Sequence, residues 1–457
     1  TLTFNIQHST FNIQLMVIFP KIDEKINIFW FRRDLRLVDN TELYYDLRSS
    51  LKLLPIFIFH NDILNKIEDK TDRRVDFISQ AIEKIQNILI SFNTSLVVMN
   101  GGPVECFKQL LLHYEINNVF ANEDYEPYAI KRDSNIKDLL SDKGINFNLY
   151  KDQVIFSSKE ILKKDNKPYT IFTPYSKLWL NKFKTNFIER NTSEKLLNNF
   201  INIGKLNLIS LKELGFKKTD FIYTEPEIDE AVILNYHKTR DYPYRNGTTN
   251  LSPHLRFGTI SIRKLVEAGL NLNQHWLNEL IWREFFMQIL ANFPQVVTSS
   301  FKLKYERIKR RNNEEEFKRW CSGETGYPLV DAGMRQLNQT GMMHNRVRML
   351  TASFLTKHLL IDWRWAEAYF ANKLLDYELS SNNGNWQWAA GCGCDAAPYF
   401  RIFNPEQQAK RFDPQAIYIK RWVPEYLSPD YTKPLVEHKF AVQRAINAYK
   451  EGISESL

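Results

Sequence analysis

INIFWF, residues 26–31, is an apolar run, broken only by Asn27, that is rich in residues that favour β-strands. Such a run is typical of a strand buried on both faces of a parallel sheet. Similar runs follow at LLPIFIF (53–59), SLVVMN (95–100) and NNVFAN (117–122). Helical patterns at 77–92 and 104–114 separate them, and this alternation predicts a doubly wound, Rossmann-like α/β domain with a parallel sheet. No GxGxxG follows the first run, so a nicotinamide site has no support.

Strand signals end near residue 150, and helical patterns dominate from Glu225 onward. We therefore expect an N-terminal extension (1–22), an α/β domain (23–150), a connector (151–225) and an all-helical domain (226–457). The extension contains TFNIQ twice before Met16. We expect Met16 to be the functional start, and a short tail without a role is the alternative.

The composition is that of an ordinary globular protein, with 44% hydrophobic and 25% charged residues among 457. No apolar run is long enough to span a bilayer, so we expect no membrane role. The net charge of +8 suits a phosphate-rich partner, although a basic balance alone is weak evidence for DNA. Four scattered cysteines favour a reducing compartment, which we take to be the cytoplasm. Cys392 and Cys394 lack a second Cys/His cluster, so we expect no metal site.

Tryptophan is concentrated in the second half, where seven of the ten lie between Trp276 and Trp388. Trp276, Glu279, Trp282 and Arg283 follow one another at intervals of three, three and one on a predicted helix. That face combines flat aromatic surface with charge. A core helix with a salt bridge at its rim is the alternative, and it would be favoured for this helix taken alone.

Five segments together carry a resemblance to a known family. They are FWFRRDLRLVDN (29–40), GTTNLSPHLRFGTIS (247–261), NELIWREFF (278–286), GETGYPLVDAGMRQLNQTGMMHNRVRM (323–349) and NNGNWQWAAGCGCDAAPYFRIFNP (382–405). In this order the chain resembles the DNA photolyase/cryptochrome family over nearly its whole length. It looks most similar to the class I enzymes that repair cyclobutane pyrimidine dimers. The resemblance implies that the helical domain binds FAD in a bent conformation.

The resemblance also implies which residues contact FAD. They are Tyr236, Thr248, Thr249, Asn250, Leu251, Ser252, Trp276, Glu279, Arg283, Arg348, Asp376, Glu378 and Asn382. GTTNLS (247–252) offers hydroxyls and backbone N–H groups at a predicted helix start, which suits a pyrophosphate. Taken alone, GTTNLS reads more readily as a capping sequence.

Two matched features would tune the flavin. Asn382 matches the position facing the flavin N5, where an amide can donate or accept a hydrogen bond without adding charge. A helix N-cap is the alternative interpretation of Asn382. Arg348 and Asp376 match an ion pair beside the flavin ring system, which would support an anionic flavin. Glu378 replaces the Asp of many relatives, and we expect this change to be tolerated.

A flipped-out dimer needs a pocket with flat apolar walls, because the target base otherwise lies inside the duplex. The resemblance assigns Trp282 and Trp388 to these walls. Asn345, Arg346, Met349 and Arg401 complete the matched pocket, and Arg240 would hold phosphates beside the lesion. Glu279, with a pKa raised by burial, would hydrogen-bond the pyrimidine edge.

The resemblance thus implies a lyase that splits cyclobutane pyrimidine dimers after light-driven electron transfer from reduced FAD. Relatives that repair (6-4) photoproducts carry a histidine pair where this chain has Asn345 and Met349, so that activity is less favoured. His344 is expected to lie on the same helix, turned about 100° from Asn345, with a structural role. A cryptochrome-type light receptor is the main alternative, and the short segment after residue 405 argues against it.

The resemblance assigns Trp386 and Trp363 to an electron-transfer chain that reduces oxidised flavin. Arg310 stands where the outer tryptophan would be. We therefore expect photoreduction to be slow, or the oxidative hole to reach the surface through Tyr305, Trp320 or Trp365 instead. The identity of a light-harvesting antenna chromophore is left open. Tyr128 and Ala129 replace the Asn and Glu that hold folate in some relatives, so folate, a deazaflavin or no antenna are all possible. We expect damaged DNA as partner and a monomer, which is the family norm.

Overall fold

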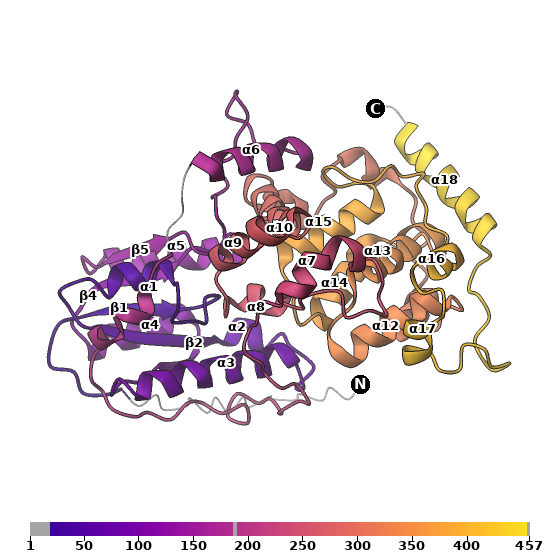
Figure 1. Cartoon of the computed structure of the whole chain (residues 1–457). Helices are drawn as coiled ribbons and strands as arrows, with labels where there is room; N and C mark the ends of the chain where they lie inside the picture. Colours follow the sequence, from indigo (N-terminus) through magenta and orange to yellow (C-terminus); the bar gives the residue numbers. More distant parts are fainter. Residues whose placement is uncertain (1–18, 186–189, 455–457) are drawn as a thin grey trace, which may run out of the picture.

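The computed structural model of the chain describes residues 19–185 and 190–454 (Figure 1). The repeated TFNIQ and Met16 lie outside the described residues. Among the residues described, no helix is both long enough and apolar enough to cross a membrane.

Five parallel strands form one sheet in the order β3-β2-β1-β4-β5. The strands are β1 (Ile26–Phe31), β2 (Leu53–His60), β3 (Val97–Gly101), β4 (Ile116–Asn122) and β5 (Asn146–Tyr150). All six residues of β1 are buried, because Ile28 and Trp30 face one apolar core whereas Phe29 and Phe31 face another. The apolar run at 26–31 therefore reflects a strand with helices packed on both faces.

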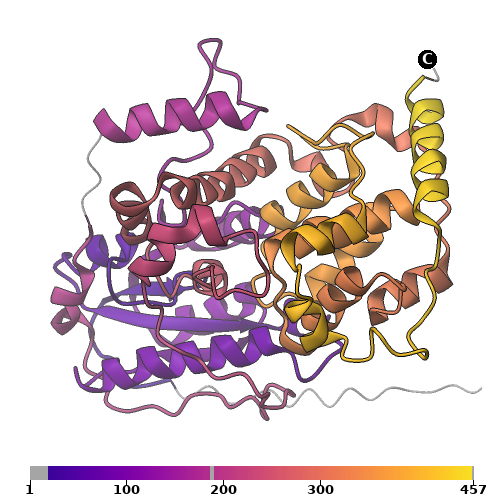
Figure 2. The ribbon, with the colours of Figure 1, turned by 45° about the vertical axis from the view of Figure 1, so that its right-hand side comes forward.

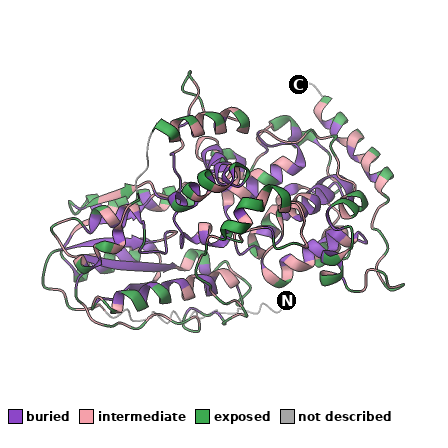
Figure 3. Ribbon diagram, viewed as in Figure 1, coloured by how far each residue is buried: buried purple, intermediate pink, exposed green. Residues whose placement is uncertain are grey.

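The helices of this half are α1 (Thr41–Asp46), α2 (Asn61–Leu64), α3 (Arg73–Ile90), α4 (Pro103–His113) and α5 (Pro127–Ser141). Helix α3 turns Val75, Ile82, Ile85 and Leu89 towards the sheet, while its outer side is exposed (Figure 3). This arrangement confirms the predicted doubly wound α/β fold with a parallel sheet.

After β5 the regular elements of the described chain are helices, joined by irregular segments such as 201–229. The α-helices of this part are α6 (Phe172–Thr185), α7 (Glu230–Thr239), α8 (Ser252–Phe257), α9 (Ile262–Leu272), α10 (Gln274–Asn292), α11 (Glu314–Ser322), α12 (Pro328–Thr340), α13 (Asn345–Ser353), α14 (Trp363–Lys373), α15 (Leu379–Ala390), α16 (Pro405–Phe412), α17 (Ile417–Trp422) and α18 (His438–Ser454). Helix α10 lies between α9 and α15 and packs against both (Figures 1 and 2). The predicted helical class of the second half is confirmed.

Residues of the expected connector (151–225) contribute to two cores. Phe200 and Phe216 pack with the residues under the sheet. Tyr175 and Trp179 pack with α10. The boundaries at residues 150 and 225 remain a prediction.

The apolar pattern over residues 334–360 predicts helix throughout, but the helix is interrupted. Helix α12 ends at Gly341, whose φ of +71° is a left-handed conformation that glycine adopts at little cost. Helix α13 then begins at Asn345, and a single π-helical segment, Phe354–His358, follows it. His344 is the N-cap of α13 and its Nδ1 accepts from the backbone N–H of Arg346. The expectation that His344 lies within the helix was therefore wrong.

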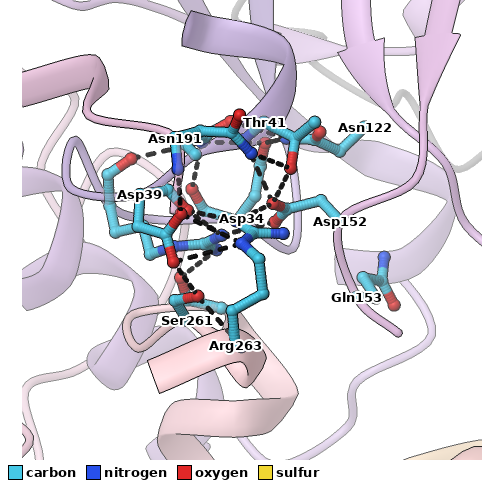
Figure 4. A network of polar contacts seen from close by, with 12 residues as sticks. Asp34, Asp39, Thr41, Asn122, Asp152, Gln153, Asn191, Ser261 and Arg263 are labelled. Atoms are coloured by element: carbon cyan, nitrogen blue, oxygen red, sulfur yellow. Dashed lines mark hydrogen bonds and ion pairs between the residues drawn. The ribbon is translucent and has the colours of Figure 1, made fainter. Parts of the chain in front are cut away.

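A buried polar network joins the carboxyl edge of the sheet to the helical half (Figure 4). Asp152, which follows β5, accepts from Arg36 and from Arg263 of α9, and Arg263 also contacts Asp39. Burial raises the pKa of Asp152, but the two guanidinium groups outweigh it and hold the pKa below its ordinary value. These charges are matched, so the network fixes how the two halves meet.

Candidate functional site

A hollow of about 640 Å³ opens in the helical half between α7, α10 and the start of α15. It falls within the range typical of cofactor sites. The expected site residues that line it are Tyr236, Thr248, Thr249, Asn250, Leu251, Ser252, Trp276, Glu279, Arg283, Asn345, Arg348, Asp376 and Glu378. Folding therefore gathers residues that lie up to 142 positions apart around one cavity.

A narrower hollow of about 100 Å³ adjoins the large one. Both are lined by Asn345, Arg348, Asp376, Glu378 and Ser381, so they form one continuous site. The narrow hollow adds the expected residues Met349, Asn382, Trp386 and Trp388.

GTTNLS enters the large hollow from the loop before α8. The N-cap of α8 is Leu251, and no side chain caps this helix. The interpretation of GTTNLS as a capping sequence is therefore wrong. Thr248 donates only a long bond of 3.3 Å, to Asn250, so the hydroxyls and amide of this loop remain available to a ligand.

Arg348 and Asp376 form the expected ion pair. The guanidinium Nη2 lies 2.9 and 3.1 Å from the two carboxylate oxygens, and the Asp376 side chain is only 5% exposed. Both residues line both hollows. A fixed, paired guanidinium thus stands at the point where the two hollows meet.

Glu378 links the cavity to the α/β half. Its Oε1 accepts from Arg33, at 2.7 Å, and from Arg283, at 3.3 Å. Burial raises the pKa of Glu378, but the neighbouring Arg283 and Arg33 outweigh it, so the pKa lies below its ordinary value. Glu378 is therefore an ionised residue that joins α10 to the loop after β1.

Asn382 lies inside α15, whose N-cap is Glu378, so the N-cap interpretation of Asn382 was wrong. Its amide nitrogen donates to the Glu367 carboxylate at 2.9 Å and to the Glu367 carbonyl oxygen at 3.2 Å. Glu367 thereby fixes the orientation of the amide, because only the nitrogen end can donate to it. Burial raises the pKa of Glu367, although the bond from Asn382 lowers it.

Glu279 forms an ion pair with Arg240 at the edge of the large hollow. Burial raises the pKa of Glu279, as expected, and the Arg240 guanidinium acts in the opposite direction. Arg240 also lies over the ring of Tyr236, 5.5 Å from its centroid. The carboxylate is thus held by one cation that itself stands on an aromatic ring.

Five expected residues line neither hollow: Arg240, Trp282, Arg346, Trp363 and Arg401. The ring of Trp282 is stacked on Phe172 of α6, with centroids 3.7 Å apart and planes 5° apart. Arg346 pairs with Asp241, and Arg401 is exposed after α15. Their roles towards a substrate remain predictions.

Trp386 and Trp388 are two positions apart on α15 and differ in burial. Trp386 is buried, with its ring 5.0 Å from Phe370 and 6.2 Å from Trp320, whereas Trp388 is half-buried. Both nevertheless line the narrow hollow.

Arg310 occupies a half-buried position beside a tyrosine. Its guanidinium donates to the Tyr449 hydroxyl at 3.0 Å, and Lys357 lies 3.8 Å above the Tyr449 ring centroid. Burial raises the pKa of Tyr449, but these two cations outweigh it and lower the pKa. Two positive charges therefore stand where the resemblance places an outer tryptophan.

Sequence reasoning missed several residues of the site. Arg33 lay within the quoted segment FWFRRDLRLVDN, yet its partner Glu378 is 345 positions away. Leu255, Arg256, Gln336 and Met343 also lay within quoted segments but were not singled out, whereas Tyr244, Ser381 and Arg421 lie outside those segments. Among the described residues, no cluster of three or more His, Cys, Asp or Glu is arranged to hold a metal.

Comparison with known proteins agrees with this geometry. The family described as "DNA photolyase" matches residues 27–193, and that described as "FAD binding domain of DNA photolyase" matches residues 276–429. The "Deoxyribodipyrimidine photo-lyase" of Vibrio cholerae is 35% identical over 473 aligned positions, which cover 93% of this chain and 99% of that protein.

Solved structures show the same similarity. A class III photolyase from Agrobacterium tumefaciens superposes with a TM-score of 0.83 at 29% identity, covering 94% of this chain and 98% of that one. A cryptochrome from Synechocystis gives 0.80 at 25% identity, covering 94% and 100%. The chain belongs to the DNA photolyase/cryptochrome family.

Proposed function

We propose that the large hollow binds FAD and that the chain is a light-dependent DNA repair lyase acting on cyclobutane pyrimidine dimers. The observation that carries the proposal is the gathering of thirteen expected residues around one cavity of about 640 Å³. The uncapped GTTNLS loop offers N–H and O–H groups to a pyrophosphate, and Arg348 offers a cation beside the ring system. These donors fit an anionic dinucleotide.

When bound, FAD supplies the light-absorbing electron donor for the reaction. The side chains of this chain hold and shield it. Asn382, oriented by Glu367, would present its carbonyl oxygen to a proton at the flavin N5. Arg348 would stabilise negative charge on the ring system, while Asp376 keeps the guanidinium in place.

The flipped dimer would be received where the two hollows meet, beside the flavin ring system that Asn382 faces. Trp388 offers a half-exposed ring for stacking, and Met349 and Asn345 offer apolar and amide contacts. Glu279 would hydrogen-bond the pyrimidine edge, and Arg240 and Arg401 would contact phosphates. We further propose that the protein acts as a monomer on DNA in the cytoplasm. The antenna, whether folate, deazaflavin or none, stays a prediction.

Illumination of the reduced protein with dimer-containing oligonucleotide tests the proposed reaction. Pyrimidine absorbance should recover in the light and remain unchanged in the dark. An oligonucleotide carrying a (6-4) photoproduct should not be repaired, because Asn345 and Met349 cannot donate the required proton. A flavin-loaded protein that repairs no dimer would favour the cryptochrome alternative.

Replacing Trp388 by alanine should weaken binding of dimer DNA roughly 10- to 100-fold, since stacking on an aromatic side chain contributes about 1–3 kcal/mol per base. Binding of undamaged DNA should change little, because no base is flipped. Filter binding of both DNAs measures the difference. Trp422→Ala, which removes another half-buried tryptophan that lines neither hollow, is the control. Equal weakening of both DNAs would contradict the assignment.

Photoreduction of the oxidised protein should be slow, because Arg310 and Lys357 disfavour a positive hole beside Tyr449. Arg310→Trp should accelerate it several-fold. Trp320→Phe should slow it, because Trp320 is the tryptophan whose ring contacts Trp386. Flavin absorbance under illumination with a thiol reductant measures the rate. An unaltered rate in Arg310→Trp would show that the chain of tryptophans is not interrupted there.

A further inference from the structure

Arg240 has two expected contacts that compete, one with Glu279 and one with a DNA phosphate. Arg240 is the C-cap residue of α7, and Glu279 lies in the second turn of α10. The Arg240 Nη1 donates to the Glu279 Oε1, and the two side chains retain 36% and 39% of their surface. If the Arg240 Nη1 turns to a DNA phosphate, its hydrogen bond to Glu279 is lost.

The surroundings make Arg240 the main counter-charge of Glu279. Burial disfavours the charged carboxylate; Arg240 is the largest influence that favours it, and His275 adds a smaller one. The nearby carboxylate of Asp241 acts against the charge. Removal of Arg240 would therefore leave a carboxylate without an adequate partner.

The residue next to Arg240 is already committed elsewhere. Asp241 is paired with Arg346, whose guanidinium also lies 4.4 Å from the centroid of the Phe412 ring. Asp241 therefore cannot retain Arg240 when a phosphate approaches. A half-exposed guanidinium that faces one carboxylate is free to exchange it for a phosphate oxygen.

We propose that Arg240 is a latch shared by Glu279 and the DNA. A phosphate beside the lesion takes over the guanidinium, and Glu279 then takes up one proton from solvent. The resulting carboxylic acid donates its O–H to the flipped pyrimidine, which a carboxylate cannot do. No electron moves in this exchange, and the proton comes from water or buffer. The proposal rests on the proposed repair function.

The latch links DNA binding to protonation. A group that gains a proton in the complex makes binding tighter at low pH. Affinity for dimer DNA should therefore fall as the pH rises above the pKa of Glu279 in the free protein, by up to about tenfold per pH unit. The fall should end above the pKa of Glu279 in the complex.

Titration calorimetry of the flavin-loaded protein with dimer oligonucleotide tests the proton uptake. Measurements near neutral pH in two buffers of different ionisation enthalpy should give an uptake approaching one proton for the wild type. Glu279→Gln should give none from this site. Glu425→Gln is the matched control, because Glu425 pairs with Arg335 at a similar exposure, 27% and 40%, and neither residue lines a hollow. It should retain the full uptake.

Infrared difference spectra distinguish a latch from a merely structural pair. The wild type should gain a protonated-carboxyl band on binding dimer DNA. Arg240→Gln should show this band before DNA is added, and Glu279→Gln should lack it throughout. A wild type that repairs dimers without proton uptake or a new band would overturn the latch and leave the repair function intact. Absence of repair itself would overturn the proposed function instead.

Discussion

Replacement of Asp376 by alanine should release most of the flavin, with FAD affinity about 10- to 100-fold lower than in the wild type. Asp376 holds the Arg348 guanidinium with two hydrogen bonds at the junction of the two hollows. Without this carboxylate the guanidinium loses its fixed position, and its charge is left unpaired inside the cavity. The loss is smaller than for a fully buried pair, because the Arg348 side chain is 26% exposed.

Fluorescence of released flavin during dilution measures this effect. Asp376→Asn should retain part of the affinity, because an amide keeps one acceptor oxygen for Arg348. Glu425→Ala breaks an ion pair outside the site and should leave flavin affinity unchanged. Tight flavin binding in Asp376→Ala would show that Arg348 is positioned by other contacts.

Gly258→Ala should reduce the free energy of unfolding by roughly 3 kcal/mol or more, the largest stability effect that we expect from a single methyl group. Gly258 follows α8 with a φ of +67°. A Cβ there would lie 2.0 Å from the carbonyl oxygen of Arg33 and 2.5 Å from the Cα of Asp34. These are backbone atoms that cannot rotate away, so the loop after β1 and the end of α8 would have to separate.

Gly144→Ala separates the steric clash from the strain of the left-handed backbone conformation. Gly144 has a similar φ of +70°, but nothing lies within 4 Å of its Cβ position. Its replacement should cost only the strain of the left-handed conformation, about 1 kcal/mol. Urea denaturation of both variants measures the difference. Equal losses of unfolding free energy would mean that α8 and the loop after β1 can move apart at little cost.

Patterns within short segments were enough to predict the fold class. The run at 26–31 is β1, and the pattern at 77–92 overlaps α3, which spans 73–90. Each pattern is read over neighbouring residues, and the hydrophobic period follows directly from which side of a strand or helix is buried. The interruption at Gly341 was missed, because a glycine in a helical pattern can be either an interior residue or a helix end.

The candidate site was predictable to the extent that its residues lie in a few short, distinctive segments. Residues 247–252 and the face formed by Trp276, Glu279 and Arg283 line the large hollow together. Trp282 belongs to the same helix, yet its ring is stacked on Phe172 of α6. Spacing along a helix could not reveal that neighbour, since it comes from a separate part of the chain.

The sequence by itself determined the alternation of strands and helices, the family and the residue types available for flavin and DNA. Only the tertiary structure decided their partners: Glu378 with Arg33, Asn382 with Glu367, and Arg240 with Glu279. The physical reason is the separation along the chain over which each kind of interaction acts. Burial and periodicity act on neighbours in the chain, whereas charge pairing and hydrogen bonding depend on distances of about 3 Å that folding sets between distant segments.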